Sequence, residues 1–375
     1  MEFTVAKSDL VRELNLSQGV VEKKTTIPIL SNVLMETDGE RILLTATDLE
    51  LGIRCSFPAK VNRQGAGTIP ARKLLDYVRL LPEANIQVKF ADNQWANLLC
   101  GRSKTRIAGM SRESFPELPR MPETIAEVRA GLLASLIGKT IFAISSEESR
   151  FTLNGALLLF RDDRITMVAT DGHRLSLVES ETGQTVGTDY RALLPRKAMA
   201  EIQRLAQDSG PEAMIRFAGD ENHLFFQLGD RLLLSRKLTG NFPDYDRVLP
   251  KEHPHQIVLG RDELRSAIER VAQFSDERSR SIRLQFAPGE LKVYSSLSET
   301  GESEESVPAE YAGPTVEIGF NAQYLLDFLR AVGEDSVSFH FKDPNSAGEM
   351  RPAPKVEADD ASKLTYRYVI MPMRI

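Results

Sequence analysis

The chain has 375 residues, which at about 150 residues per domain predicts two or three domains. Its 42% hydrophobic and 27% charged residues are typical of a globular protein and exclude a disordered or fibrous one. The net charge of −6 argues against indiscriminate attachment to nucleic acid or anionic membrane, although one restricted basic face can still meet a nucleic acid.

The predicted elements follow the same order three times along the chain. The first segment opens with a helix marked by Leu10 and Leu14, has a second helix marked by Leu74 and Val78, and contains half-buried strands such as 86–90. The second and third segments repeat this order, with opening helices over 132–137 and 264–271 and later strands over 214–217 and 337–341. Each segment is therefore predicted to be an α+β unit with antiparallel sheets on one side and two helices on the other.

Local motifs recur at the same spacing. Thr47-Asp48-Leu49 and Thr170-Asp171-Gly172 follow equivalent apolar runs, and the segments 70–78 and 195–202 match, with a fainter third copy at 319–328. The segments 115–118 and 242–245 each close a unit. Three domains of about 125 residues follow, with seams in proline-containing stretches. Their expected bounds are 1–121, 122–249 and 250–375.

The apolar stretches are all shorter than the roughly 18 to 20 residues that a membrane span needs, and residues 1–7 lack the apolar core of a signal peptide. We therefore expect a cytoplasmic protein with no membrane partner. Cys55 and Cys100 are too few for a disulfide framework or a structural zinc site, so each is expected to be a small buried side chain.

Residue patterns typical of catalysis are incomplete. Gly138-Lys139-Thr140 lacks the first glycine of a phosphate-binding loop, because Leu133 occupies that position. Asp48 and Asp171 occupy the same turn of two repeats and are predicted to form turns rather than an acid/base pair. The histidines are scattered, and His253-Pro254-His255 is predicted to be a surface loop rather than a metal pair. We therefore expect no catalytic residue, cofactor or metal.

Several of these segments together resemble the bacterial sliding clamp family, the beta subunit of DNA polymerase III. They are the triple repeat, the opening residues 1–5, the segments 45–50, 168–175 and 242–245, and the terminal 368–375. The resemblance runs over the whole chain. It implies two chains of three clamp domains each, closed head to tail around duplex DNA with helices inside, and a processivity factor without catalysis of its own.

Encirclement explains how an acidic protein can stay on DNA and still slide. Non-specific phosphate contacts give dissociation constants of only about 10⁻⁴ to 10⁻⁶ M and weaken with salt. Weak contacts from the inner helices are therefore enough once topology prevents escape. The resemblance implies DNA contacts from Lys24, Arg72, Lys73, Arg150, Arg196 and Lys197, whereas Glu147 replaces a polar amide of the family at a loop tip.

The resemblance also places a dimer seam between a basic strand near residues 101–107 and an acidic stretch at 299–305. Such a contact is heterologous and yields a ring if its rotation closes. Exposed ion pairs contribute only about 0 to 1 kcal/mol each, so strand pairing and apolar packing have to supply most of the affinity. The implied interface residues are Arg102, Lys104, Arg106, Ile107, Phe274, Glu302, Glu304 and Glu305.

A pocket for short linear peptides is the third implication of the resemblance. Taken alone, the terminal segment 368–373 is typical of a core strand, but thioether side chains can also adapt to varied apolar ligands. The implied partners are the polymerase III catalytic subunit, the clamp loader, other polymerases and repair proteins. The implied pocket residues are Leu153, Thr170, Gly172, His173, Arg174, Leu175, Pro243, Arg247, Val248, Val369, Met371, Pro372, Met373 and Arg374.

The polar tract 343–362 is predicted to be a mobile loop beside this pocket. Two other function classes remain open from the sequence. One is a hydrolase that uses Asp48, Asp171 or His173, and the other is a peptide-binding adaptor that never meets DNA.

Overall fold

The structure is a computed structural model that describes residues 1–22, 25–183, 187, 189–297, 301–353 and 364–374. The chain folds into two compact units. The first comprises Met1–Ala134 and Lys197–Lys237, and the second comprises Ser135–Arg196 and Leu238–Ile375. No helix among the described residues is both long and apolar enough to cross a membrane.

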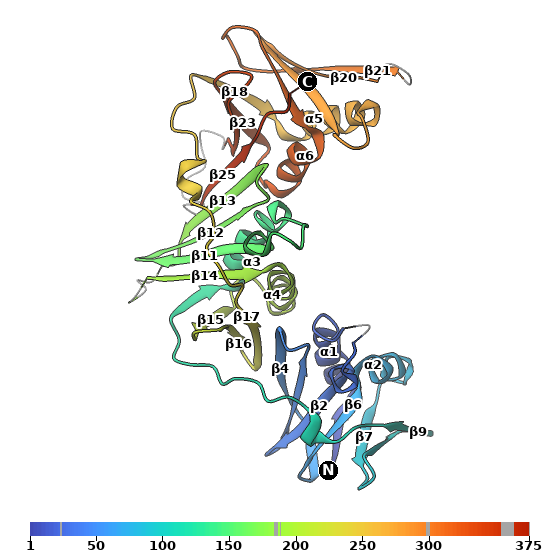
Figure 1. The fold of residues 1–375 in the computed structure, drawn as a ribbon. Helices are drawn as coiled ribbons and strands as arrows, with labels where there is room; N and C mark the ends of the chain where they lie inside the picture. Colours follow the sequence, from blue (N-terminus) through green and yellow to red (C-terminus); the bar gives the residue numbers. More distant parts are fainter. Residues whose placement is uncertain (23–24, 184–186, 188, 298–300, 354–363, 375) are drawn as a thin grey trace. The chain divides into compact units, whose positions relative to one another are not determined.

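The first unit contains two antiparallel sheets (Figure 1). One sheet has the strand order β5-β1-β7-β8-β9. Its strands are β1 (Glu2–Ala6), β5 (Lys60–Arg63), β7 (Asn85–Phe90), β8 (Trp95–Cys100) and β9 (Ser103–Ala108). The other has the order β10-β15-β16-β17-β4-β3-β2-β6. Its strands are β2 (Asn32–Asp38), β3 (Arg41–Thr47), β4 (Leu51–Pro58), β6 (Ala66–Pro70), β10 (Ala126–Arg129), β15 (Met214–Gly219), β16 (His223–Leu228) and β17 (Arg231–Arg236).

Two helices, α1 (Lys7–Ser17) and α2 (Ala71–Leu80), lie side by side in the first unit (Figure 1). Leu10 and Leu14 of α1 are fully buried, as are Leu74 and Val78 of α2, so the predicted apolar stripes are confirmed. The opposite face of α2 carries exposed charged side chains. The chain leaves this unit within α3 (Ala130–Gly138) and returns at the start of α4 (Arg196–Ser209).

The second unit also contains two antiparallel sheets. One has the order β14-β11-β12-β13-β25-β24-β23-β18. Its strands are β11 (Gly155–Arg161), β12 (Arg164–Thr170), β13 (Arg174–Glu181), β14 (Tyr190–Pro195), β18 (His255–Gly260), β23 (Ser336–Phe341), β24 (Gly348–Pro352) and β25 (Thr365–Ile370). The other has the order β21-β20-β19-β22, with β19 (Ser281–Ala287), β20 (Glu290–Leu297), β21 (Gly301–Pro308) and β22 (Val316–Asn321). Helices α5 (Arg261–Val271) and α6 (Ala322–Ala331) pack together.

Each eight-stranded sheet joins two consecutive repeats. In the first unit β4, the fourth strand of the first repeat, pairs antiparallel with β17, the last strand of the second repeat. In the second unit β13 pairs with β25 in the same way. The corresponding fourth strand of the third repeat, β21, and the last strand of the first repeat, β9, each pair on one side only among the described residues.

The predicted turns are confirmed at both aspartates. Asp48 Oδ1 accepts hydrogen bonds from the backbone N–H groups of Glu50 at 2.9 Å and Leu51 at 2.6 Å. Asp171 Oδ1 accepts from the N–H groups of His173 and Arg174 at 2.9 and 3.1 Å. Both side chains therefore mimic a backbone turn, as aspartate does at such positions.

Gly138 ends α3, so Gly138-Lys139-Thr140 is the end of a helix rather than a phosphate loop. Lys139 Nζ donates to the Ala331 carbonyl at 3.2 Å, and Thr140 Oγ1 donates to the Leu136 carbonyl at 2.8 Å. Cys55 and Cys100 are buried and unbridged, as expected.

Two expectations about the third repeat are wrong. The tract 343–362 contains β24, which was expected to be part of a mobile loop; it pairs with β23 and β25 because Met350 is fully buried between Phe339 and Tyr368. Residues 354–362 of this tract lie outside the described residues. His253 is not a surface residue, because its side chain is only 8% exposed and its Nε2 lies 2.7 Å from Oε2 of the fully buried Glu349.

Glu349 is the centre of a buried charge cluster. Its carboxylate also accepts hydrogen bonds from Arg351 and Arg367 at 2.7 and 2.6 Å. Burial alone would raise the pKa of Glu349, but these partners and His253 lower it to about 2. The nearby His340 has its pKa lowered to about 4, first by burial and then by the positive charges of Arg351 and His253.

His340 is expected to make stability depend on pH. The pKa of His340 is about 4 in the folded chain, whereas an unperturbed histidine has a pKa of 6.5. Between these two pH values the unfolded chain therefore binds one more proton than the folded chain. Stability is then fully present above about pH 6.5 and is lost as the pH falls toward 4, by about 3 kcal/mol at most. In urea unfolding, the midpoint of H340Q should fall less between pH 7 and pH 4.5 than that of the parent chain. Parallel curves would contradict the assignment.

Candidate functional site

The second unit holds an apolar cluster where β11, β12, β13 and β25 meet the segment that follows Phe242. Its buried members are Leu153, Leu157, Val168, Leu175, Leu177, Leu193, Phe242 and Val369, and half-buried Tyr245, Val248 and Ala347 pack against it. Four residues of the predicted pocket are thereby brought together: Leu153, Leu175, Val248 and Val369. The cluster forms an apolar floor.

The turn between β12 and β13 borders this floor. Thr170 Oγ1 donates to the Arg174 carbonyl at 2.6 Å and accepts from the Gly172 N–H at 3.1 Å. Gly172 has φ +88°, a conformation that side chains disfavour, and a Cβ there would lie 3.0 Å from Nη1 of Arg150. His173 is held at an exposed position, where it can contact a ligand.

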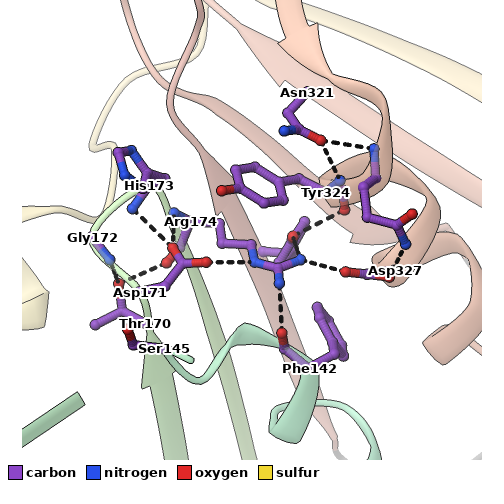
Figure 2. Close-up of polar contacts among 12 residues, drawn as sticks. Phe142, Ser145, Thr170, Asp171, Gly172, His173, Arg174, Asn321, Tyr324 and Asp327 are labelled. Carbon is purple, nitrogen blue, oxygen red and sulfur yellow. Dashed lines mark hydrogen bonds and ion pairs between the residues drawn. The ribbon is translucent and has the colours of Figure 1, made fainter. Parts of the chain in front are cut away.

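Arg174 ties this turn to helix α6 (Figure 2). Its guanidinium donates to Asp171 at 3.0 Å, to Asp327 at 2.6 Å and to the Phe142 carbonyl at 2.6 Å. It also lies over the ring of Tyr324, 4.3 Å from the centroid. Since the Arg174 side chain is only 9% exposed, we assign it to holding the turn in place rather than to contacting a ligand.

The network keeps Arg174 charged. Burial by itself lowers the pKa of this guanidinium, but Tyr368 and Asp327 raise it by more. Burial raises the pKa of Tyr368, whose ring stacks on Phe328 with centroids 5.2 Å apart. The site therefore has a fixed positive charge that is compensated within the fold.

The C-terminal segment leaves β25 beside the same turn. The Met371 N–H donates to the His173 carbonyl at 2.9 Å, and the Met373 N–H donates to the Gly319 carbonyl at 2.8 Å. The Met371 side chain is 39% exposed although it adjoins a buried strand. An exposed thioether beside an apolar floor can receive an apolar side chain from outside.

Three predicted pocket residues are solvated. Pro243 and Arg374 are exposed, and Arg247 is 85% exposed in an ion pair with Asp244 at 2.8 Å. Sequence reasoning missed Tyr324 and Asp327. Their spacing offered a signal, because Tyr324 and Asp327 are three residues apart and so lie side by side on the surface of α6.

Removing Arg174 is expected to destabilise the second unit strongly. In R174A, Asp171 and Asp327 lose their buried partner, and such a loss costs about 3 to 5 kcal/mol. Calorimetry of R174A should show the unfolding transition of the second unit at a lower temperature than in the parent chain. The control R161A, which removes a 73% exposed arginine, should leave the unfolding transitions nearly unchanged. Equal transitions in the two variants would rule out this role.

The whole chain matches models of one protein family. The N-terminal, central and C-terminal domains of the DNA polymerase III beta subunit match residues 1–119, 127–244 and 246–374. Beta sliding clamps of Pseudomonas putida and Chlamydia pneumoniae are 36% and 34% identical, and the matches cover all of this chain and 100% and 99% of theirs. The chain belongs to the sliding clamp family of DNA polymerase III beta subunits.

Solved structures agree with this assignment. The Pseudomonas aeruginosa sliding clamp bound to griselimycin has a TM-score of 0.93 at 34% identity. The Bartonella birtlesii clamp bound to griselimycin has a TM-score of 0.92 at 33% identity. In both cases the full length of each chain is covered. The three predicted clamp domains are thus confirmed, although their exact bounds stay a prediction.

The residues of this clamp that were predicted to meet DNA differ in how free they are. Arg72 and Lys73 are exposed in the first turn of α2, and Arg196 and Lys197 are exposed in the first turn of α4. Lys197 forms an ion pair with Asp48. Arg150 is bound by Glu147 at 2.8 Å and donates to the Asp171 carbonyl, and Lys24 lies outside the described residues.

Most residues of the clamp that were predicted to form a dimer seam lie on or beside β9 and β21, two strands at the edges of their sheets. Arg102, Lys104 and Arg106 are exposed on β9 or its turn, and Glu302 and Glu304 are exposed on β21. Three residues have other surroundings. Ile107 is buried within its own unit at 4% exposure, Glu305 is held by Arg270 at 2.6 Å, and Phe274 is 36% exposed.

Proposed function

We propose that this clamp pairs β21 of one chain with β9 of a second, closes a ring of two chains around duplex DNA, and recruits partner proteins to the apolar floor in the second unit. The observation that carries the proposal is the pair of free strand edges. Unpaired edges expose rows of N–H and C=O groups, and proteins normally protect them. The charges on the two edges are opposite.

The internal repeat supports head-to-tail closure. In both eight-stranded sheets the fourth strand of one repeat pairs with the last strand of the next. The same rule applied to the remaining strands pairs β21 with the β9 of another copy. Two such contacts pair the open edges of β9 and β21 in both chains, so closure leaves neither of these two strands unpaired on one side.

Equivalent positions in the three repeats can be matched by following a row of directly opposed residues from strand to strand across each sheet. Rows that start three residues before the second helix of each repeat end on the fourth strand of that repeat, at Arg54, Leu177 and Glu304. In each repeat the first residue of the opening helix donates a hydrogen bond to a carbonyl later in the repeat. Rows that start four residues after that carbonyl end on the last strand of the repeat, at Thr105, Leu233 and Tyr368.

The two pairings within the chain share one register. Leu233 faces Ile53, and Tyr368 faces Ser176, so the last-strand position faces the residue before Arg54 or Leu177 in both cases. Transferred to the free edges, this register puts Thr105 opposite Ser303. Lys104 then faces Glu304, and Arg106 faces Glu302. Opposite charges directly across a strand pair stabilise it.

The recruitment role rests on the apolar floor beside Met371 and His173. Met371 follows Val369 of this floor by two residues and is exposed to solvent, and the turn that borders the floor is held in place by the Arg174 network. Short linear motifs of the polymerase III catalytic subunit, the clamp loader, other polymerases and repair proteins are the proposed ligands. We assign no catalytic step to the chain, since its aspartates serve as turns.

Retention on DNA tests the encirclement. After loading by a clamp loader with ATP, the clamp should stay on nicked circular DNA and leave within minutes once a restriction enzyme linearises it. The measurement is the amount of protein that co-elutes with DNA in gel filtration. Equal retention on circles and linear molecules would overturn the proposal, and retention on neither would favour an adaptor that does not meet DNA.

A further inference from the structure

The first unit contains a polar cavity that takes no part in the proposed strand pairing and is separate from the apolar floor. It has a volume of about 230 Å³ and lies where the segment after Ser114 crosses β2, β3 and β4. Its lining residues are Leu34, Glu36, Thr45, Arg54, Arg112, Phe115, Pro116, Glu117, Leu118 and Arg120.

Two residues that line this cavity each bury a polar atom that has no partner among the described residues. Thr45 Oγ1 and Arg54 Nε are both buried and make no hydrogen bond there. Thr45 is only 2% exposed, and it lies directly opposite Arg54 across β3 and β4. A buried polar group without a partner costs about 1 to 3 kcal/mol, and more if it is charged. A ligand that displaces the groups covering these two atoms would remove this cost by accepting hydrogen bonds from them.

The equivalent positions in the second repeat are apolar. The rows that end at Arg54 and Leu177 place Thr45 and Val168 at the same point of the sheet. Val168 and Leu177 belong to the apolar floor of the second unit. The sheet can therefore be completed at these positions without polar atoms, so folding alone does not require Thr45 and Arg54.

The charges around the cavity leave an excess of arginine. Arg112 is already bound by Glu36 at 3.0 Å. Arg54 and Arg120 remain, against the single carboxylate of Glu117. An arginine fork suits a planar carboxylate, which can accept from Nε and from a terminal nitrogen together.

Apolar side chains border the same cavity. Leu34 and Phe115 form a buried cluster there with Ile29 and Leu30, and Leu118 packs against a second cluster beside β17. A ligand that fits must combine a carboxylate with adjoining apolar groups. A peptide with an acidic residue next to a leucine-like residue has this chemistry.

We propose that this cavity is a second peptide-docking site, which binds an acidic side chain of a partner protein through Arg54 Nε and Thr45 Oγ1 and seats a neighbouring apolar side chain against Phe115. This proposal depends neither on ring closure nor on the role of the apolar floor. The cavity gives the clamp a second binding site, either for a partner protein that is already bound to the second unit or for a different partner protein.

Selection from a display library of random heptapeptides tests the proposal. The full chain is the target. The counter-target is T45V/R54L, which introduces the residue types found at the equivalent positions Val168 and Leu177 of the second repeat. Peptides that survive counter-selection should carry Asp or Glu beside an apolar residue. In fluorescence polarisation, changing that acid to its amide should weaken binding to the parent chain about tenfold or more.

R236L is the matched control, because it removes an exposed β17 arginine that pairs with Glu50 outside the cavity. It should bind the selected peptides like the parent chain, while T45V/R54L should not. The acid-to-amide comparison uses the parent chain alone, so it stands even if the double variant folds poorly. The proposal is overturned if no acidic peptide is selected, or if acid and amide peptides bind equally.

Discussion

Reversing the charges of Lys104 and Arg106 to glutamate is expected to convert the proposed clamp dimer into monomers. In the derived register the two new glutamates face Glu304 and Glu302, and like charges directly across a strand pair are destabilising. With two seams in the ring, four attractive pairs become repulsive. At roughly 1 kcal/mol for each pair, the loss is about 4 kcal/mol, close to a thousandfold in dimer affinity. Sedimentation velocity at micromolar concentration measures it.

A charge swap tests the register as well as the seam. K104E alone should weaken the dimer, and adding E304K should restore it, because the pair is then rebuilt with its charges exchanged. E302K adds the same charge two residues away and should rescue less well. If both second changes rescue equally, the strands pair in another register. If K104E/R106E remains a dimer, the β9–β21 contact is refuted.

Strand pairing and charge have different roles at this seam. Exposed ion pairs contribute little on their own, and Ile107 is already buried within its unit. Backbone hydrogen bonds along the two edges and packing at the partly exposed Phe274 must therefore supply most of the affinity. The charges mainly select the correct partner strand and the correct register, which is what opposite charges on two edges can achieve.

The sequence predicts the repeated fold well because its signals are local. The apolar spacing of Leu74 and Val78 marks α2, and the Asp48 and Asp171 turns follow from the chemistry of aspartate. β24 escapes prediction because it is a five-residue strand inside a polar tract, and its burial comes from Phe339 and Tyr368.

The site is less predictable because its contacts are distant in sequence. Arg174 and Asp327 are 153 residues apart, and His253 and Glu349 are 96 apart, so no local pattern marks either pair. The resemblance supplied the residues around Met371, whereas composition alone favours a core strand there. The role of Arg174 emerges only once its side chain is seen to be enclosed.

Deleting Met371–Ile375 is expected to abolish peptide binding at the second unit while leaving the dimer intact. The deletion removes the exposed thioether and the hydrogen bonds to the His173 and Gly319 carbonyls. The deletion removes no residue of β9 or β21, the two strands of the proposed seam. Fluorescence polarisation with a labelled peptide from the polymerase III catalytic subunit should lose its signal, and sedimentation should still report a dimer.

Single substitutions separate contact from folding. Met371 and Met214 are 39% and 40% exposed, and Met214 lies on β15 of the first unit. M371A should weaken peptide binding by roughly 1 to 2 kcal/mol, about five- to thirtyfold, because an apolar contact is lost. M214A should have no effect. Equal binding by M371A and the parent chain, or persistence of binding after the deletion, would place the peptide site elsewhere.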